Sequence, residues 1–313
     1  MSLIFDFITT TGIVFLGIYL AIVSSPNKLI IWILWGIIFI SNVCKLVINI
    51  REREKRKKKE KKDETKEDYY QIKAERRELI DRDLLMEYID GLGDHPELQH
   101  YLNSAEKLED ENKYNEAIEE YKKCLSHPRA TNDNKVAANI LMGNCYYNIS
   151  QLTEAKNNYR QALIISKKVK DKNKRLIGKA SCLGNIGLIY SAKGGSDEAL
   201  KYHKDALKIH RKIGDKLKEA NQLGDIGLIY SDKEEPDEAL KYLEDALNMY
   251  REIEYKKGEA NQLGNIGLIY LAKGESDEAL KYLEDALNIF DKYNLQRGRK
   301  IIQKAVDDIK KQK

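Results

Sequence analysis

The stretch "NQLGDIGLIY", residues 221–230, returns almost unchanged as "NQLGNIGLIY" at residues 261–270. A third version, "SCLGNIGLIY", begins at Ser181, so successive versions lie forty residues apart. Self-similarity at a fixed period of this size is typical of proteins built by stacking repeats. One repeat cannot bury its own apolar face, whereas stacked copies form a continuous core.

Each copy carries the same framework: a glycine, a tyrosine three residues later, and alanines twelve and nineteen residues later. The framework residues are Gly187, Tyr190, Ala199 and Ala206 in the first copy, with their equivalents forty and eighty residues on. Small residues at these offsets suit two helices whose backbones approach closely. Between the helices we expect turns, with Ser196 and Ser276 as N-caps and Pro236 at a helix entrance.

This framework resembles the tetratricopeptide repeat, and the resemblance covers residues 97–295 in about five repeats. Weaker copies surround Gly143 and Ala105. The forty-residue period and the "LGNIG" sequence are similar to the long repeats of kinesin light chains and partner-of-inscuteable adaptors. The resemblance implies an all-α superhelical solenoid, in which the first helix of each pair lines a concave groove. Residues 297–313 are expected to form a capping helix.

Function is expected in repeated residues that packing does not require. An asparagine amide both donates and accepts hydrogen bonds, so it suits recognition of a peptide backbone. The alternative is that these asparagines bond within their own repeats. A clamp for a terminal carboxylate is not expected, because glycine stands three residues before each framework glycine. The candidate groove residues are Asn185, Leu188, Asn221, Asp225, Leu228, Asn261, Asn265 and Leu268.

The first fifty residues predict a membrane anchor. Residues 7–23 are uncharged, and residues 29–48 contain one charge, Lys45. Each segment is near the lower length for a membrane-spanning helix, and the polar turn between them suits a helical hairpin. A cleaved signal peptide is the alternative, but no cation precedes the apolar segment. A hairpin buried in a soluble domain is a second alternative.

A basic block follows the second apolar segment and predicts the orientation of the chain. Residues 51–62 hold nine Lys or Arg against three Glu, whereas the rest of the chain is slightly acidic. The positive-inside rule places this flank, and the solenoid after it, in the cytoplasm. The block either sets only the topology or also binds anionic lipid headgroups. Its cations are Arg51, Arg53, Lys55, Arg56, Lys57, Lys58, Lys59, Lys61 and Lys62.

Residues 51–92 are rich in Lys, Glu and Arg and predict a charged helical stalk. Its second part carries an apolar face able to dock on the residues that follow.

Several classes of function are not expected. The four cysteines form no CxxC pair and are interpreted as reduced, mostly buried thiols. His203 and His210 do not recur in the sibling repeats and are interpreted as surface or packing residues. No metal or cofactor is expected, and a near-neutral body argues against nucleic acid as a partner. No catalytic motif is present, so an enzyme is the least favoured class.

The sequence therefore predicts a membrane-anchored adaptor that binds a protein or peptide partner in a cytoplasmic groove. The alternative is a permanent structural subunit of a membrane complex.

Overall fold

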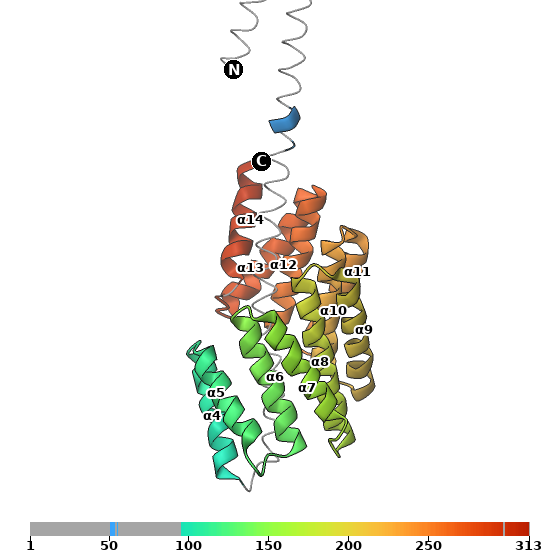
Figure 1. Cartoon of the computed structure of the whole chain (residues 1–313). Helices are drawn as coiled ribbons and strands as arrows, with labels where there is room; N and C mark the ends of the chain where they lie inside the picture. The colour runs from blue at the N-terminus through green and yellow to red at the C-terminus, as the bar shows by residue number, and fades with distance from the viewer. Residues whose placement is uncertain (1–50, 54, 56–94, 297, 313) are drawn as a thin grey trace, which may run out of the picture. The chain divides into compact units, whose positions relative to one another are not determined.

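The computed structural model describes residues 51–53, 55, 95–296 and 298–312. Contacts divide the chain into two compact units, residues 1–64 and 65–313. In the first unit, residues 51–53 and 55 are helical and exposed. The second unit contains the solenoid of helices shown in Figure 1.

The solenoid consists of five helix pairs followed by a single helix. The first helices are α4 (Pro96–Asp110), α6 (Asn132–Asn148), α8 (Lys172–Ala192), α10 (Lys216–Asp232) and α12 (Lys256–Lys273). The second helices are α5 (Tyr114–Ser126), α7 (Leu152–Ser166), α9 (Ser196–Ile213), α11 (Pro236–Glu252) and α13 (Ser276–Lys292). The single helix is α14 (Arg299–Gln312). Each first helix packs against its own second helix and, from α6 onward, against the second helix before it. The prediction of an all-α solenoid is confirmed for this part of the chain.

The framework residues form the contact inside each pair. A methyl group added to Gly227 would lie 2.8 Å from Cγ of Leu243 and 3.1 Å from the carbonyl oxygen of Ala239. At Gly267, an added methyl group would lie 2.7 Å from Cγ of Leu283. The second helices therefore approach the first helices at the glycines, as the sequence predicts.

The framework tyrosines pair with tyrosines of the second helices. Tyr190 stacks on Tyr202, and the two later repeats contain the same stacked pair, with ring centroids 5.3 to 5.5 Å apart. All six rings are partly exposed.

First and second helices differ in how they are buried. In α10, every residue from Gln222 to Ile229 is buried, which is more than two helical turns. In α11, by contrast, burial follows one stripe that includes Leu240, Leu243 and Leu247. A single stripe is typical of a helix that covers one side of a core. The first helices α6, α8, α10 and α12 are therefore enclosed, whereas α4 buries a single stripe. The second helices form the outer layer.

The expected helix starts need one correction. Ser196 and Ser276 are the first residues of α9 and α13, and the N-cap positions are occupied by Gly195 and Glu275 without a side-chain cap. Each serine therefore lies one residue too far into its helix to cap it. Acidic residues still occupy both first turns, as the helix dipole favours. Pro236 stands at the first position of α11, as expected.

Helix α14 closes the described end of the solenoid. Its apolar residues Ile302, Val306 and Ile309 are buried in the same cluster as Leu263 of α12. Ile302 lies so close to Gly264 that an added methyl group there would meet its Cδ1 at 2.8 Å. This contact repeats the one between Gly184 and Gln222, so α14 lies where the first helix of a further repeat would lie.

The predicted membrane hairpin, residues 7–23 and 29–48, lies outside the described residues, as does most of the stalk at 51–92. Within the part that is described, no helix is both long and apolar enough to cross a bilayer.

Candidate functional site: the first helices and their turns

The eight candidate groove residues differ in accessibility. All of them lie on first helices, as expected. Asn221 and Asn261 are partly exposed and occupy the same position in successive repeats. The other six are buried: Asn185, Leu188, Asp225, Leu228, Asn265 and Leu268. The two accessible asparagines are therefore the members of the set best placed to meet a partner.

Asn185 is bound by the preceding repeat. Its Nδ2 donates to Oδ1 of Asn144 at 3.2 Å, and the hydroxyl of Tyr159 donates to the same oxygen at 2.6 Å. Asn144 directly follows the framework glycine Gly143, a position that is leucine in the later repeats. Asn144 was not among the predicted site residues, although the sequence "MGNC" shows an asparagine directly after the framework glycine.

Asn221 and Asn261 have different partners although their positions are equivalent. The hydroxyl of Tyr250 donates a hydrogen bond to Oδ1 of Asn221. One repeat later, Phe290 stands in the place of Tyr250 and has no hydroxyl to donate. Asn261 forms no hydrogen bond with any residue that the structure describes. Asn261 is therefore the member of this pair whose amide is not engaged by a described residue.

Asp225 faces the second helix of the preceding repeat. Its Oδ2 lies 3.8 Å from Nδ1 of His203, and the same nitrogen lies 2.9 Å from Oε1 of Gln222. His203 is fully buried and contacts Gly187, where an added methyl group would lie 2.7 Å from the imidazole. His203 is thus a buried packing residue.

The second histidine of α9 is also buried. Nδ1 of His210 lies 3.6 Å from Oδ2 of Asp215, which caps α10 by accepting a hydrogen bond from the backbone of Lys218. The interface between α9 and α10 therefore contains two buried histidines, each facing an aspartate. The equivalent positions in the next repeat are Leu243 and Tyr250.

Asn265 and the leucines complete the candidate set. Asn265 donates from Nδ2 to Oε1 of Gln262 at 3.3 Å, and both side chains are fully buried. Leu228 and Leu268 belong to the apolar cluster shared by the helices from α10 to α14.

The basic block is described only in part. Arg51, Arg53 and Lys55 are exposed on a helical segment. The remaining six cations of the block lie outside the described residues. Among the described side chains, no group of three or more His, Cys, Asp or Glu residues is arranged to hold a metal ion.

Known proteins share both the repeat and the fold. A family model described as tetratricopeptide repeat matches residues 134–212, 179–252 and 218–292, which together span half of the chain. No curated protein gives a significant match to the sequence.

Several solved structures share the fold. Aspartyl phosphate phosphatase F from Bacillus subtilis is 17% identical with a TM-score of 0.57, covering 68% of this chain and 58% of that one. The Rap conjugation gene regulator of plasmid pLS20, solved in complex with the Phr* peptide, is 21% identical with a TM-score of 0.55, covering 63% and 54%. A variant of the nearly identical TPR-like repeats of a putative kinesin light chain from Podosopora anserina is 17% identical with a TM-score of 0.52, covering 64% and 98%.

At these identities the structural likeness shows the fold alone. The family match, the forty-residue framework and the stacked helix pairs agree with one another. The chain belongs to the tetratricopeptide repeat family of helical protein-binding scaffolds.

Proposed function

We infer that this protein is a membrane-anchored scaffold that binds a protein or peptide partner along its first helices. Such a scaffold raises the local concentration of its partner at the bilayer, which promotes encounters without any chemical step. The Rap regulator solved with the Phr* peptide indicates that a solenoid of this fold is compatible with a bound peptide.

The observation that carries the partner-binding part is the contrast between Asn221 and Asn261. Both amides are partly exposed at equivalent positions, but only Asn221 is held by a neighbouring tyrosine. An amide with an open donor and acceptor can bond the backbone of an extended or helical peptide. Asn261 is therefore the residue on which we centre the proposed recognition surface.

The membrane part rests on the sequence. Two apolar segments precede a block of cations, and the described cations Arg51, Arg53 and Lys55 are exposed. Cations that directly follow a spanning segment favour the cytoplasmic side. The proposed location is therefore a membrane, with the solenoid on the cytoplasmic side.

Partner binding is tested by capture from the detergent extract of native membranes with full-length protein. We expect Asn261→Ala to lose specific partners at unchanged stability, since this side chain has no bond to a described residue. The matched control is Asn288→Ala, because Asn288 is an exposed asparagine on the outer surface of α13. Partners lost with Asn261→Ala and retained with Asn288→Ala identify the client. If both variants capture the same proteins as the wild type, Asn261 does not bind partners and a permanent structural subunit becomes the better interpretation.

Anchoring is tested by alkaline extraction of membranes that contain the full-length protein. The protein is expected to stay in the membrane pellet. Protease added outside sealed vesicles should cleave the solenoid only in vesicles whose cytoplasmic side faces outward. Release into the alkaline supernatant would contradict the anchor without affecting the partner-binding result.

A further inference from the structure

The turn between α7 and α8, residues 167–171, is longer than the equivalent turns of the two later repeats, residues 214–215 and 253–255. The framework glycines Gly143 and Gly187 lie 44 residues apart, whereas the later ones lie forty apart. The additional residues lengthen α8, which has 21 residues compared with 17 in α10 and 18 in α12. Insertions within a repeat typically map to one face of a solenoid, and that face often binds a partner.

The lengthened turn is fixed to the solenoid by its own backbone and by one apolar side chain. Val169 is buried in the apolar cluster beneath the turn. Its carbonyl oxygen accepts a hydrogen bond from Nη1 of Arg175 at 3.0 Å. The carbonyl oxygen of Lys168 lies 3.4 Å from Nδ2 of Asn132, at the start of α6. The turn therefore has a defined conformation.

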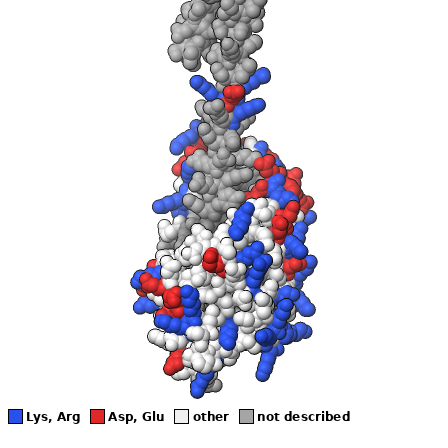
Figure 2. Space-filling view, in the orientation of Figure 1, with Lys and Arg blue, Asp and Glu red and all other residues white. Residues whose placement is uncertain are grey.

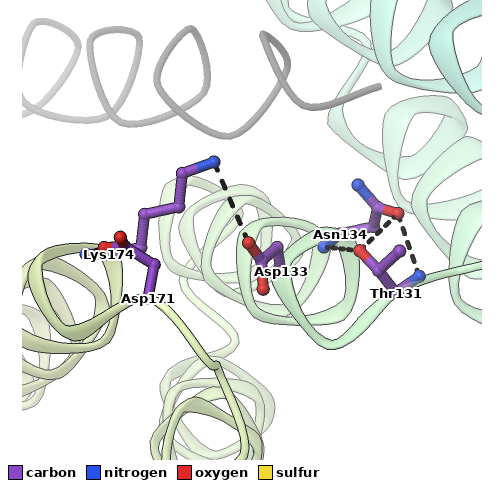
Figure 3. A network of polar contacts seen from close by, with 5 residues as sticks. All are labelled: Thr131, Asp133, Asn134, Asp171 and Lys174. Carbon is purple, nitrogen blue, oxygen red and sulfur yellow. Dashed lines mark hydrogen bonds and ion pairs between the residues drawn. The ribbon is translucent and has the colours of Figure 1, made fainter. Parts of the chain in front are cut away.

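A polar network joins the starts of α8 and α6 (Figure 3). The side chain of Asp171 caps α8 by accepting from the backbone of Lys174 at 2.8 Å. Nζ of Lys174 lies 3.8 Å from Oδ2 of Asp133. Thr131 and Asn134 form a capping box at the start of α6. The acidic groups near the turn are thus already engaged with α8.

Four lysines of the turn remain exposed. They are Lys167, Lys168, Lys170 and Lys172, and none forms an ion pair with a residue that the structure describes. In the orientation of Figure 1, basic side chains gather at the lower right of Figure 2, where the lower ends of α7 and α8 lie.

The two later turns carry cations too, but most of those cations are paired with acids. In the next turn, Arg211 pairs with Glu219 at 2.7 Å, and Lys216 pairs with Glu252. In the following turn, Arg251 and Lys256 both pair with Glu259. At the next turn, Lys212 is also exposed without an ion pair to a described residue, but the lengthened turn carries four such lysines. Unpaired positive charge is therefore concentrated at the lengthened turn.

An exposed isoleucine lies next to these lysines. Ile164 is 53% exposed and lies three and four residues before Lys167 and Lys168, near the end of α7. The equivalent residues of the later repeats are polar: Lys208, Asn248 and Asn288. We define Ile164, Lys167, Lys168, Lys170 and Lys172 as the basic turn.

We propose that the basic turn binds the surface of a lipid bilayer that contains anionic lipids. Lysine ammonium groups near such a surface gain electrostatic attraction, and an adjacent apolar side chain can enter the boundary between headgroups and acyl chains. An acidic peptide fits less well, because the lysines project from the end of a helix pair and are flexible point charges without the planar fork of arginine. A flat anionic surface, by contrast, can attract lysine side chains in any arrangement.

This inference does not depend on the partner bound at Asn261. Together with the proposed anchor, it would hold one edge of the solenoid against the bilayer and thereby orient the first helices.

The test uses full-length protein incorporated into vesicles, with a fluorophore next to the basic turn. The variant Cys44→Ser, Asn173→Cys provides one exposed thiol, since Asn173 is exposed and the described cysteines are buried. Quenching of the fluorophore by brominated lipids then reports contact with the bilayer. We expect strong quenching in phosphatidylcholine vesicles that contain phosphatidylserine, weak quenching in phosphatidylcholine alone, and loss of quenching at high salt.

The decisive variant changes Lys167, Lys168, Lys170 and Lys172 to Gln. The bilayer-contacting population should fall relative to the free one by more than roughly fivefold, which is about the contribution of a single lysine near an anionic surface. The matched control changes four other exposed lysines to Gln and should leave quenching unchanged. These are Lys193, Lys201, Lys281 and Lys300.

Three results would overturn the proposal: equal quenching in both lipid mixtures, equal loss in the two quadruple variants, or binding of a labelled oligonucleotide through the four lysines without lipid quenching. Sedimentation of the protein with pure phosphatidylcholine vesicles separately tests the anchor. A failure of the anchor is thereby distinguished from a failure of the basic turn.

Discussion

Arg299 at the start of α14 pairs with Asp291 at the end of α13, donating from Nε to Oδ1 and from Nη2 to Oδ2. One repeat earlier, Arg251 and Glu259 form the same contact at equivalent positions with the charges exchanged. Because both residues changed together, the ion pair persists at the junction with the single closing helix. The pairing therefore requires opposite charges at these two positions and tolerates either arrangement.

Charge reversal at this junction should be rescued by a second reversal. We expect Arg299→Glu to lower the melting temperature, because two carboxylates would face each other where the pKa of Asp291 is now held below its usual value by Arg299. The double variant Asp291→Arg, Arg299→Glu reproduces the arrangement of Arg251 and Glu259 and should recover most of the loss. Thermal unfolding followed by circular dichroism measures both. The control is Lys300→Glu, which makes the same charge change at an exposed neighbour; an equal loss there would refute a specific pair.

The framework glycines should not tolerate a side chain. In Gly227→Ala, the new methyl group would lie 3.1 Å from the carbonyl oxygen of Ala239, and a backbone atom cannot move aside without separating the two helices. Overpacking of this kind costs about 1–3 kcal/mol. Gly195→Ala is the control, since its methyl group would meet its nearest atoms at 3.4 Å. Denaturant titration should show a lowered midpoint for Gly227→Ala alone, and similar midpoints for both variants would contradict the close approach.

The sequence was sufficient to predict the helix pairs because their contacts recur at a fixed period. Gly227 and Leu243 lie sixteen residues apart in one repeat, and the same spacing returns at Gly267 and Leu283. Repetition distinguishes such packing positions from chance similarity. The buried residues Ile302, Val306 and Ile309 of α14 likewise follow helical spacing.

Contacts that occur once could not be predicted in the same way. Asn185 and Asn144 lie 41 residues apart, and their hydrogen bond depends on how α8 is aligned with α6. No sibling repeat carries the same pair of asparagines. The bond from Tyr250 to Asn221 also occurs once, because the equivalent pair of the next repeat is Phe290 and Asn261, and phenylalanine has no hydroxyl. The basic turn was not predicted, for a different reason. The interval of 44 residues between Gly143 and Gly187 is visible in the sequence, but only the structure shows which lysines lack an ion pair with a described residue.

The cysteines of the solenoid should be unreactive in the folded protein. Cys124, Cys145 and Cys182 are buried thiols, and burial raises the pKa of Cys124 to about 11. Since the thiolate is the reactive form, a disulfide reagent at mildly alkaline pH should modify none of these three thiols before unfolding. Thiol titration in denaturant should then reveal all four cysteines of the chain. Rapid modification of more than one thiol in the folded protein would contradict this burial.

Glu259 should make stability depend on pH in the acidic range. Burial alone would raise the pKa of this carboxyl, but hydrogen bonds from Lys256 at 2.8 Å and Arg251 at 3.0 Å outweigh burial and lower it. A carboxyl whose pKa is lower in the folded than in the unfolded state stabilises the fold above the unfolded value, near 4.3. The stabilisation is lost as the pH falls through the lower folded value.

The variant Glu259→Gln carries no charge at any pH and isolates this contribution. At neutral pH we expect it to be less stable than the wild type by about 1 kcal/mol, in the range of ion pairs and charged hydrogen bonds that are partly exposed. The difference should shrink as the pH falls below about 4, because the wild-type carboxylate then takes up a proton. Urea titrations at a series of pH values measure it, with Glu244→Gln as the control, since Glu244 is exposed and forms no ion pair with a described residue. A difference that stays constant from neutral to acidic pH would mean that Glu259 contributes through packing, because packing does not titrate.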